Sequence, residues 1–105
     1  DRRNEYAALL GTMIRNWRET FKDNNLPFYI VELADFLHKE DKEGRKAWQQ
    51  MRDEQAKVTD TVTGTELIKN KDLGEWNDIH PLDKKTLGKR VCKAALKDIK
   101  KQLKR

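Results

Sequence analysis

A run of four apolar residues, Phe28 to Val31, most constrains the fold of this chain. Phe, Tyr, Ile and Val all favour strands, and a strand with one solvated face would alternate apolar with polar residues. The uninterrupted run therefore predicts a strand buried on both faces, of the kind found in parallel sheets between two layers of helices. Such a strand requires helices above and below it and other strands beside it.

Three segments have the apolar spacing of helices. The first spans Tyr6 to Phe21 and ends before the turn-forming residues 23–25. The second runs from Arg45 to Val58. The third runs from Lys84 to about Lys104, and Asp83 is well placed to cap its N-terminus. The expected apolar face of this third helix consists of Leu87, Val91, Ala94, Ala95, Ile99 and Leu103.

Weaker patterns occupy the connections between these segments. Residues 38–43 are charged and loop-like, residues 59–64 are rich in β-branched and turn-forming types, and residues 65–68 suggest a second, weaker strand. Residues 71–81 fit neither period and are expected to form a loop. The resulting order of helix, strand, helix, strand, loop and helix predicts an α/β fold with a parallel sheet.

Two strands alone would leave both edges of such a sheet open. The composition also argues against a large self-sufficient core, because 36% of the residues are hydrophobic and 39% are charged, against about 45–50% and about 25% in typical globular chains. Three Trp, three Phe and two Tyr are nevertheless too many for a plainly disordered chain. We therefore expect further strands from an upstream segment or from a partner chain.

The net charge of +5 is concentrated towards the C-terminus. Residues 83–105 contain ten basic residues and two acids, whereas residues 1–82 carry a net charge of −3. One interpretation is a basic helix that contacts nucleic acid or an acidic partner. The other is a solvated outer helix face. The lysines are spread around most of the helix outside its apolar stripe, without forming one groove-facing ridge with aromatics, which favours the solvated face and no contact with nucleic acid.

Several classes of protein are disfavoured by patterns that the sequence lacks. Cys92 is the only cysteine, so an internal disulfide and a cysteine-rich zinc site are excluded. No apolar run approaches the roughly 18 residues of a membrane helix, and the first ten residues lack a signal-peptide pattern. His38 and His80 lie far apart without a ligand cluster, and no phosphate-binding glycine motif occurs, so neither a metal nor another cofactor is expected. Three single residues have plain structural interpretations. Cys92 is expected to be semi-buried, His38 to be merely solvated, and Arg52 to form a structural ion pair.

Residues 72–81 combine side chains that suit proton transfer. His80 precedes Pro81, which favours an extended backbone at His80, in a strand-to-helix connection of the kind where α/β folds place their sites. Asp78 lies two residues earlier and could orient the ring or stabilise the imidazolium. The alternative is an ordinary loop histidine beside a helix cap. Trp76, close by, could stack on a sugar ring or simply pack.

This loop belongs to the longer stretch DLGEWNDIHPLDKKTLGKR at residues 72–90. The stretch resembles the C-terminal signature of the sialate O-acetylesterase family of carbohydrate esterases, within the SGNH (GDSL-like) hydrolases. The family pattern runs roughly D-[IL]-G-[DE]-x-x-D-I-H-P-x-[ND]-K-x-x-[LV]-G-x-R. The matching residues are Asp72, Leu73, Gly74, Glu75, Asp78, Ile79, His80, Pro81, Asp83, Lys84, Leu87, Gly88 and Arg90.

Three further blocks resemble the same family in the same order. Residues 14–18, IRNWR, resemble its L-I-x-x-W-R helix. Residues 27–34, PFYIVELA, resemble its P-F-x-x-V-Q-L strand, with Glu32 where the family often has Gln. Residues 48–55, WQQMRDEQ, resemble its W-x-x-L-R-x-x-Q helix. Four blocks in order cover nearly the whole chain, which is more specific than any one of them.

The resemblance implies a flavodoxin-like, three-layer α/β/α fold with a parallel sheet, in which residues 1–105 are the C-terminal portion of a single SGNH hydrolase domain. In the family a serine in a Gly-x-Ser-Asn type motif is the nucleophile, beside an oxyanion hole and a histidine base. No such motif occurs here. The resemblance therefore implies that His80 is the base and that the N-terminal part of the same protein supplies the serine and is needed for activity.

The third member of the catalytic triad stays open. Many SGNH hydrolases have an Asp three residues before the histidine, and Asn77 occupies that position here. Asp78, Asn77 or no residue at all could therefore support His80. The resemblance further implies an acetylated sugar substrate, such as O-acetyl sialic acid, contacted by Trp76, and an extracytoplasmic location, periplasmic or secreted. The alternative function is a basic helical module that contacts nucleic acid or an acidic partner.

Overall fold

The computed structural model describes residues 2–104 of the chain. A short 3-10 turn, η1 (Arg3–Glu5), precedes the first helix. The remaining elements are α1 (Tyr6–Thr20), β1 (Phe28–Val31), α2 (Lys42–Thr61), β2 (Thr65–Ile68), the 3-10 turn η2 (Lys71–Leu73) and α3 (Lys84–Leu103). The predicted order of helix, strand, helix, strand, loop and helix is confirmed.

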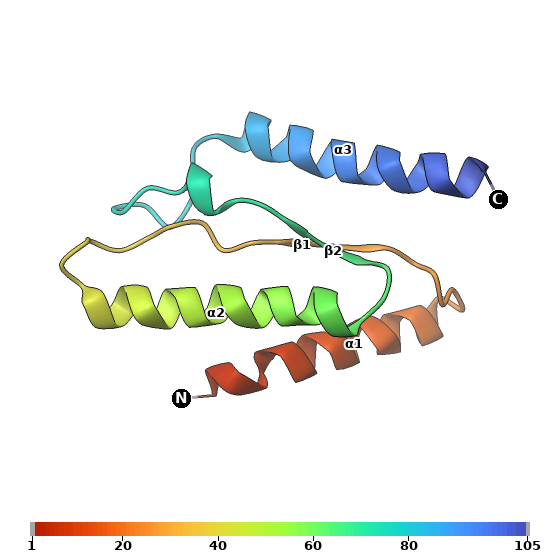
Figure 1. Ribbon diagram of the computed structural model, residues 1–105, viewed down its shortest axis with the longest axis horizontal. Helices are drawn as coiled ribbons and strands as arrows, with labels where there is room; N and C mark the ends of the chain where they lie inside the picture. Colours follow the sequence, from red (N-terminus) through yellow and green to blue (C-terminus); the bar gives the residue numbers. More distant parts are fainter. Residues whose placement is uncertain (1, 105) are drawn as a thin grey trace.

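The two strands are neighbours in one parallel sheet. Their register pairs Phe28 with Thr65 at one end and Val31 with Ile68 at the other. Figure 1 shows α3 on one side of the strands and α1 and α2 on the other, so that helices lie on both faces. The prediction of a mixed α/β fold with a parallel sheet is confirmed in this form, as three helices around a two-stranded sheet.

The hydrophobic core lies between α1, α2 and the face of the strands that they cover. Its centre consists of Ile14 from α1, Ile30 from β1, Val58 from α2 and Val62, which follows α2. Ile14 and Val58 are completely buried. The partly buried residues around this centre are Ala7, Leu10, Phe28 and Leu67. Burying an aliphatic side chain of this size contributes about 1.5–3 kcal/mol, so a core this small gives the chain limited stability.

Helix α2 extends beyond the predicted segment, residues 45–58, at both ends. It begins three residues earlier because the Asp41 carboxylate accepts a hydrogen bond of 2.9 Å from the Gly44 N–H and caps the helix. At the other end the Thr61 hydroxyl donates to the Lys57 carbonyl at 3.0 Å, so this β-branched residue satisfies its hydroxyl within the helix. The predicted boundaries are therefore wrong by three residues at each end.

Helix α3 begins as predicted but is only partly covered. The Asp83 carboxylate accepts hydrogen bonds from the Thr86 N–H at 2.9 Å and from the Thr86 hydroxyl at 2.7 Å, which confirms the cap. Of the predicted apolar face, Ala94 is buried whereas Leu103 is 81% exposed. Cys92 is exposed, so its expected semi-buried position is wrong. Both departures have one cause: α3 packs mainly on β2, and this leaves one side of the helix without a neighbour.

Strand β1 is covered on one face, whereas the sequence predicts burial on both. Ile30 is buried in the core, but Val31, on the opposite face, is 41% exposed. Tyr29 shares the face of Val31, and its hydroxyl donates to Asp98 Oδ2 of α3 at 2.5 Å. Burial and this hydrogen bond raise the pKa of Tyr29 to about 12. Helix α3 reaches β1 through this bond but packs on β2, so Val31 remains uncovered.

The outer edge of β1 is partly occupied by a side chain. Phe28 and Glu32 donate towards β2, so the alternate residues Val31 and Leu33 direct their backbone groups to the other edge. There the buried Gln55 amide donates to the Val31 carbonyl at 3.1 Å and accepts from the Leu33 N–H at 2.9 Å. The glutamine side chain thus makes the two hydrogen bonds that a neighbouring strand would make at this point.

Helix α1 has a second apolar face that is largely exposed, although the Trp17 ring contacts Phe28 of β1 with the ring centroids 6.0 Å apart. One face carries Ile14 into the core. The other carries an apolar stripe that recurs every four residues and is exposed along its length: Leu9, Met13, Trp17 and Phe21. Contiguous exposed apolar surface of this kind marks an interface or a risk of aggregation.

These uncovered surfaces predict that the 105-residue chain alone has a weakly cooperative thermal transition. Because the strand edge and the α1 stripe are poorly packed, fewer contacts must break together when the chain unfolds. Circular dichroism at rising temperature measures the transition, and a dye that binds apolar surface should already fluoresce below it. A sharp melt at about 45–65 °C without dye binding would contradict the expectation.

Candidate functional site

The loops that follow the two strands lie side by side at the carboxyl end of the sheet. Because β1 and β2 are parallel and in register, both loops leave the sheet at the same edge. Three backbone hydrogen bonds continue the pairing into the loops: Glu32 N to Ile68 O (3.0 Å), Asp35 N to Lys71 O (3.1 Å) and Leu37 N to Trp76 O (2.9 Å). The predicted loop of residues 71–81 therefore lies where α/β folds place their sites.

Gly74 is a point of very close approach between the two loops. A Cβ atom at this position would lie 2.2 Å from the Asp35 carbonyl oxygen and 2.3 Å from the Asp35 nitrogen. Both distances are far below van der Waals contact, so only glycine allows the two backbones to meet here.

His80 presents its ring to solvent, with 88% of the side chain exposed. Asp78 Oδ1 accepts a hydrogen bond of 2.8 Å from the His80 backbone N–H, which forms an Asx turn. The same oxygen lies 3.9 Å from His80 Nδ1, too far for a hydrogen bond. Asp78 therefore orients the backbone of His80, and its carboxylate lies near the ring without holding it. Asn77 is exposed.

Trp76 contacts His38, the other histidine of the chain. The rings of Trp76 and His38 are nearly perpendicular, at 85°, with centroids 5.0 Å apart. Leu37, just before His38, has a φ of 85°, a left-handed conformation that costs energy for a leucine. The Leu37 N–H donates to the Trp76 carbonyl at 2.9 Å. The expectation that His38 is merely solvated is therefore wrong. The one signal in the sequence for this contact is that His38 and Trp76 follow two parallel strands, whose loops leave the sheet at the same edge.

Arg52 forms the structural ion pair that the sequence predicts. Its side chain is 6% exposed, and Nη1 lies 3.1 Å from Asp35 Oδ1. Nε and Nη2 of Arg52 both donate to Gln49 Oε1, at 3.0 and 2.8 Å. A buried guanidinium needs such partners. The bonds to Gln49 lie within α2, so only the ion pair with Asp35, at which Nη1 makes no aligned hydrogen bond, connects α2 to the loop that follows β1.

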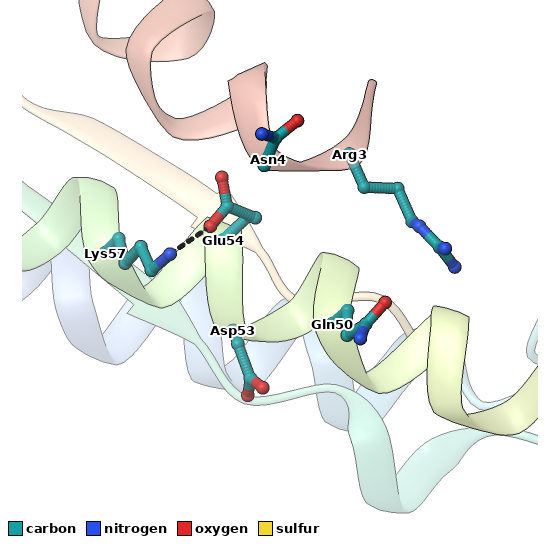
Figure 2. A pocket seen from close by; sticks show the side chains of 6 residues that line it. All are labelled: Arg3, Asn4, Gln50, Asp53, Glu54 and Lys57. Carbon is teal, nitrogen blue, oxygen red and sulfur yellow. Dashed lines mark hydrogen bonds and ion pairs between the residues drawn. The ribbon is translucent and has the colours of Figure 1, made fainter. Parts of the chain in front are cut away.

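A hollow of about 500 Å³ lies elsewhere, between the N-terminal turn and α2 (Figure 2). Its lining is polar and charged: Arg3, Asn4, Gln50, Asp53, Glu54 and Lys57. Glu54 is bonded to Lys57, which lowers the pKa of the Glu54 carboxyl, and accepts a second hydrogen bond from the Ala7 N–H at 3.4 Å. The hollow shares no residue with the His80 loop, so it does not enlarge the predicted site.

No family model, curated protein or solved structure matches this chain. Within residues 2–104, no three His, Cys, Asp or Glu side chains gather closely enough to hold a metal ion. No helix in the described part of the chain is long and apolar enough to cross a membrane. The case for a site therefore depends on the His80 loop and its neighbours at the carboxyl end of the sheet.

The contact at Gly74 makes a prediction about stability. Gly74→Ala should lower the free energy of unfolding of the intact protein that carries these residues by about 1–3 kcal/mol, because the added methyl forces the two loops apart. Gly88→Ala is the matched control: nothing lies within 4 Å of its Cβ position, so alanine in the helix should raise stability by up to about 1 kcal/mol. Urea unfolding measures both changes. Equal midpoints for Gly74→Ala and the parent would contradict the close approach.

Proposed function

We propose that this chain is the C-terminal portion of a carbohydrate O-acetylesterase domain of the sialate O-acetylesterase type. In this proposal the domain has the flavodoxin-like, three-layer SGNH hydrolase fold, and His80 is the base that activates a serine from the N-terminal part of the same protein. The observation that carries the proposal is the exposed ring of His80, in a loop at the carboxyl end of a parallel strand pair.

The four sequence blocks that resemble the family also support the proposal. Residues 27–34 contain β1, residues 48–55 lie on α2, and residues 72–90 contain the His80 loop and the start of α3. Hydrogen bonds connect residues 27–34 with residues 48–55, since Gln55 donates to the Val31 carbonyl and Trp48 Nε1 donates to the Ala34 carbonyl. The bond from Asp35 N to Lys71 O joins the residues that flank the strand block and the His80 block. The resemblance therefore involves segments that lie next to one another in the fold.

The proposed chemistry is transfer of an acetyl group through serine. As the serine oxygen attacks the acetyl carbonyl, His80 takes the hydroxyl proton. The imidazolium gives that proton to the sugar oxygen as the ester C–O bond breaks, which leaves acetyl-serine. The imidazole then takes a proton from water as the water oxygen attacks this ester, and it returns that proton to the serine oxygen as the ester C–O bond breaks and acetic acid, which ionises to acetate, is released. An unbonded, exposed ring fits this role, because the nucleophile must approach His80 from another segment.

Uncovered apolar surfaces support the presence of an N-terminal part. Among the described residues, the α1 stripe and the far side of α3 are largely exposed, and no strand pairs with the outer edge of β1, where only the Gln55 side chain bonds. In a three-layer fold further strands would extend the sheet beside β1, and further helices would cover the exposed sides of α1 and α3. The same arrangement would cover Val31, which is half exposed here.

Trp76 is the proposed substrate-binding residue. Its indole is exposed and belongs to the same loop as His80, where an aromatic face can pack against the C–H groups of a sugar ring. The proposed substrates are acetylated sugars such as O-acetyl sialic acid. By the same resemblance, the proposed location is extracytoplasmic, periplasmic or secreted.

Replacement of the base tests the proposal. In the complete enzyme, His80→Ala should lower turnover of an acetyl ester by on the order of a thousandfold or more, because the serine hydroxyl keeps its proton at neutral pH. His38→Ala is the comparison variant. It removes the other imidazole of the chain, whose described ring contact is with Trp76, and it should lower turnover far less. Near-parental turnover in His80→Ala would eliminate the mechanism.

A second pair of variants identifies the residue that supports the imidazolium. Asp78→Asn keeps an oxygen that can accept from the His80 N–H and removes only the charge. If the carboxylate supports the ring during catalysis, turnover should fall on a scale similar to that of His80→Ala. If it serves only the backbone turn, the loss should be about tenfold or less, roughly 1.4 kcal/mol. A larger loss in Asn77→Ala than in Asp78→Asn would assign the role to Asn77.

A second candidate function is binding of nucleic acid or an acidic partner by α3. It is favoured by a groove along the helix that four lysines line, together with Cys92 and Leu96: Lys89, Lys93, Lys97 and Lys100. No aromatic side chain lines this groove, so these four lysines do not form the ridge with aromatics that the sequence argues against. Asp98 is the one acid in α3. It does not line this groove, because its carboxylate accepts a hydrogen bond from Tyr29 on the opposite side of the helix.

Salt dependence separates this candidate from a solvated face. Fluorescence anisotropy with labelled duplex DNA should show weak binding that disappears at about 0.15 M salt if the lysines are only solvated. A sequence-selective complex that survives at that salt concentration would establish the binding function.

A further inference from the structure

His80 lies in a loop of residues 74–83, between the turn η2 and helix α3. A loop of this length has many conformations unless its two ends are held together. The position of His80 therefore depends on what connects η2 to α3.

Arg90 of α3 makes that connection. Its Nη1 and Nη2 donate to the two carboxylate oxygens of Asp72, both at 2.7 Å, and Nη1 also donates to the Lys69 carbonyl at 2.8 Å. Two parallel bonds between a guanidinium and a carboxylate restrict both distance and angle, which one charge pair on a flexible stem does not. The side chains are partly shielded, at 30% and 42% exposed. We call these three bonds the Arg90 clamp.

The turn η2, to which Arg90 binds through Asp72, is also hydrogen-bonded to the end of β1. Glu32, just after β1, accepts hydrogen bonds at Oε1 from the Asn70 N–H at 3.2 Å and the Lys71 N–H at 2.9 Å. Asp72 therefore lies on a turn that is bonded to the end of β1, and Arg90 joins α3 to this rigid point. The carboxylate of Glu32 thus has a structural role at the position where the resembling family often has Gln.

We propose that Arg90 is a positioning residue for His80: its bonds to Asp72 and Lys69 close the base of the His80 loop. The closure of the loop stands on the geometry alone, whereas its importance for turnover rests on the proposed function. Arg90 does not contact His80, and it acts by limiting the positions that the loop can take.

The clamp persists over the pH range in which a histidine base works. The hydrogen bonds from Arg90 lower the pKa of Asp72 to about 2, and Asp72 in turn raises the pKa of Arg90. A carboxyl whose pKa is lowered on folding keeps its partner until the pH falls towards that value. Asp72 and Arg90 therefore stay charged at every pH at which imidazole titrates, and the clamp does not itself act as a pH switch.

Amide hydrogen exchange on the intact protein that carries these residues tests loop closure directly. Arg90→Gln removes all three bonds and should accelerate exchange in residues 74–80 by about tenfold. Asp72→Asn leaves the bond from Arg90 to Lys69 and should have a smaller effect in the same residues. Arg45→Lys is the matched control, because Arg45 is exposed on α2 and no described contact of the site involves it. Exchange in the Arg45→Lys protein should equal that of the parent.

Turnover of an acetyl ester tests the positioning role. Arg90→Gln should lower kcat by about tenfold and leave KM within about twofold, since the substrate site is intact and only the base is misplaced. Arg90→Lys keeps the charge but cannot form the paired bonds, so it should recover part of the loss. An ordinary loss of stability would instead accelerate exchange across the whole protein.

The outcomes separate the two proposals. Unchanged exchange in residues 74–80 of Arg90→Gln, or faster exchange throughout the protein, would overturn the clamp. Faster local exchange with unchanged kcat would overturn the positioning role while His80→Ala still reports on the esterase. An active His80→Ala protein would remove the esterase and the positioning role together, and exchange would then decide loop closure by itself.

Discussion

The parallel pairing of β1 with β2 determines where the chemically interesting side chains lie. Its register continues beyond the strands as three backbone hydrogen bonds between the loops. Two segments separated by α2 are therefore brought together at one edge, which places His38 against Trp76. An antiparallel pair would send the two loops to opposite ends of the sheet. The candidate site is thus a direct consequence of strand direction.

Most elements of the fold could be predicted because their causes are local. The apolar run at residues 28–31 indicates a strand, and Asp83 begins α3 through a side chain three residues from its partner. The ends of α2 could not be predicted with the same accuracy, since Asp41 and the threonines at its C-terminal end compete between turn and helix conformations. Burial of β1 on both faces was a further expectation that α3 does not meet, because it packs mainly on β2.

The candidate site was predictable in position but not in its contacts. The sequence places His80 in a loop before a helix, and the structure agrees. Whether Asp78 bonds the ring or the backbone depends on a side-chain torsion, which sequence spacing does not determine. The pairing of Asp72 with Arg90 joins residues 18 positions apart. It requires knowing how α3 crosses the end of β2, and residue types alone do not supply this.

The side chain of Gln55 has a consequence for the shape of any larger sheet. Its amide occupies the Val31 carbonyl and the Leu33 N–H at the outer edge of β1. A strand added at that edge can bond to β1 around Tyr29 but must turn away before it reaches Val31. The two chains would then diverge towards the carboxyl end and open a crevice beside the loop that carries His38. Gln55 therefore determines the residue of β1 at which an added strand would have to separate from it.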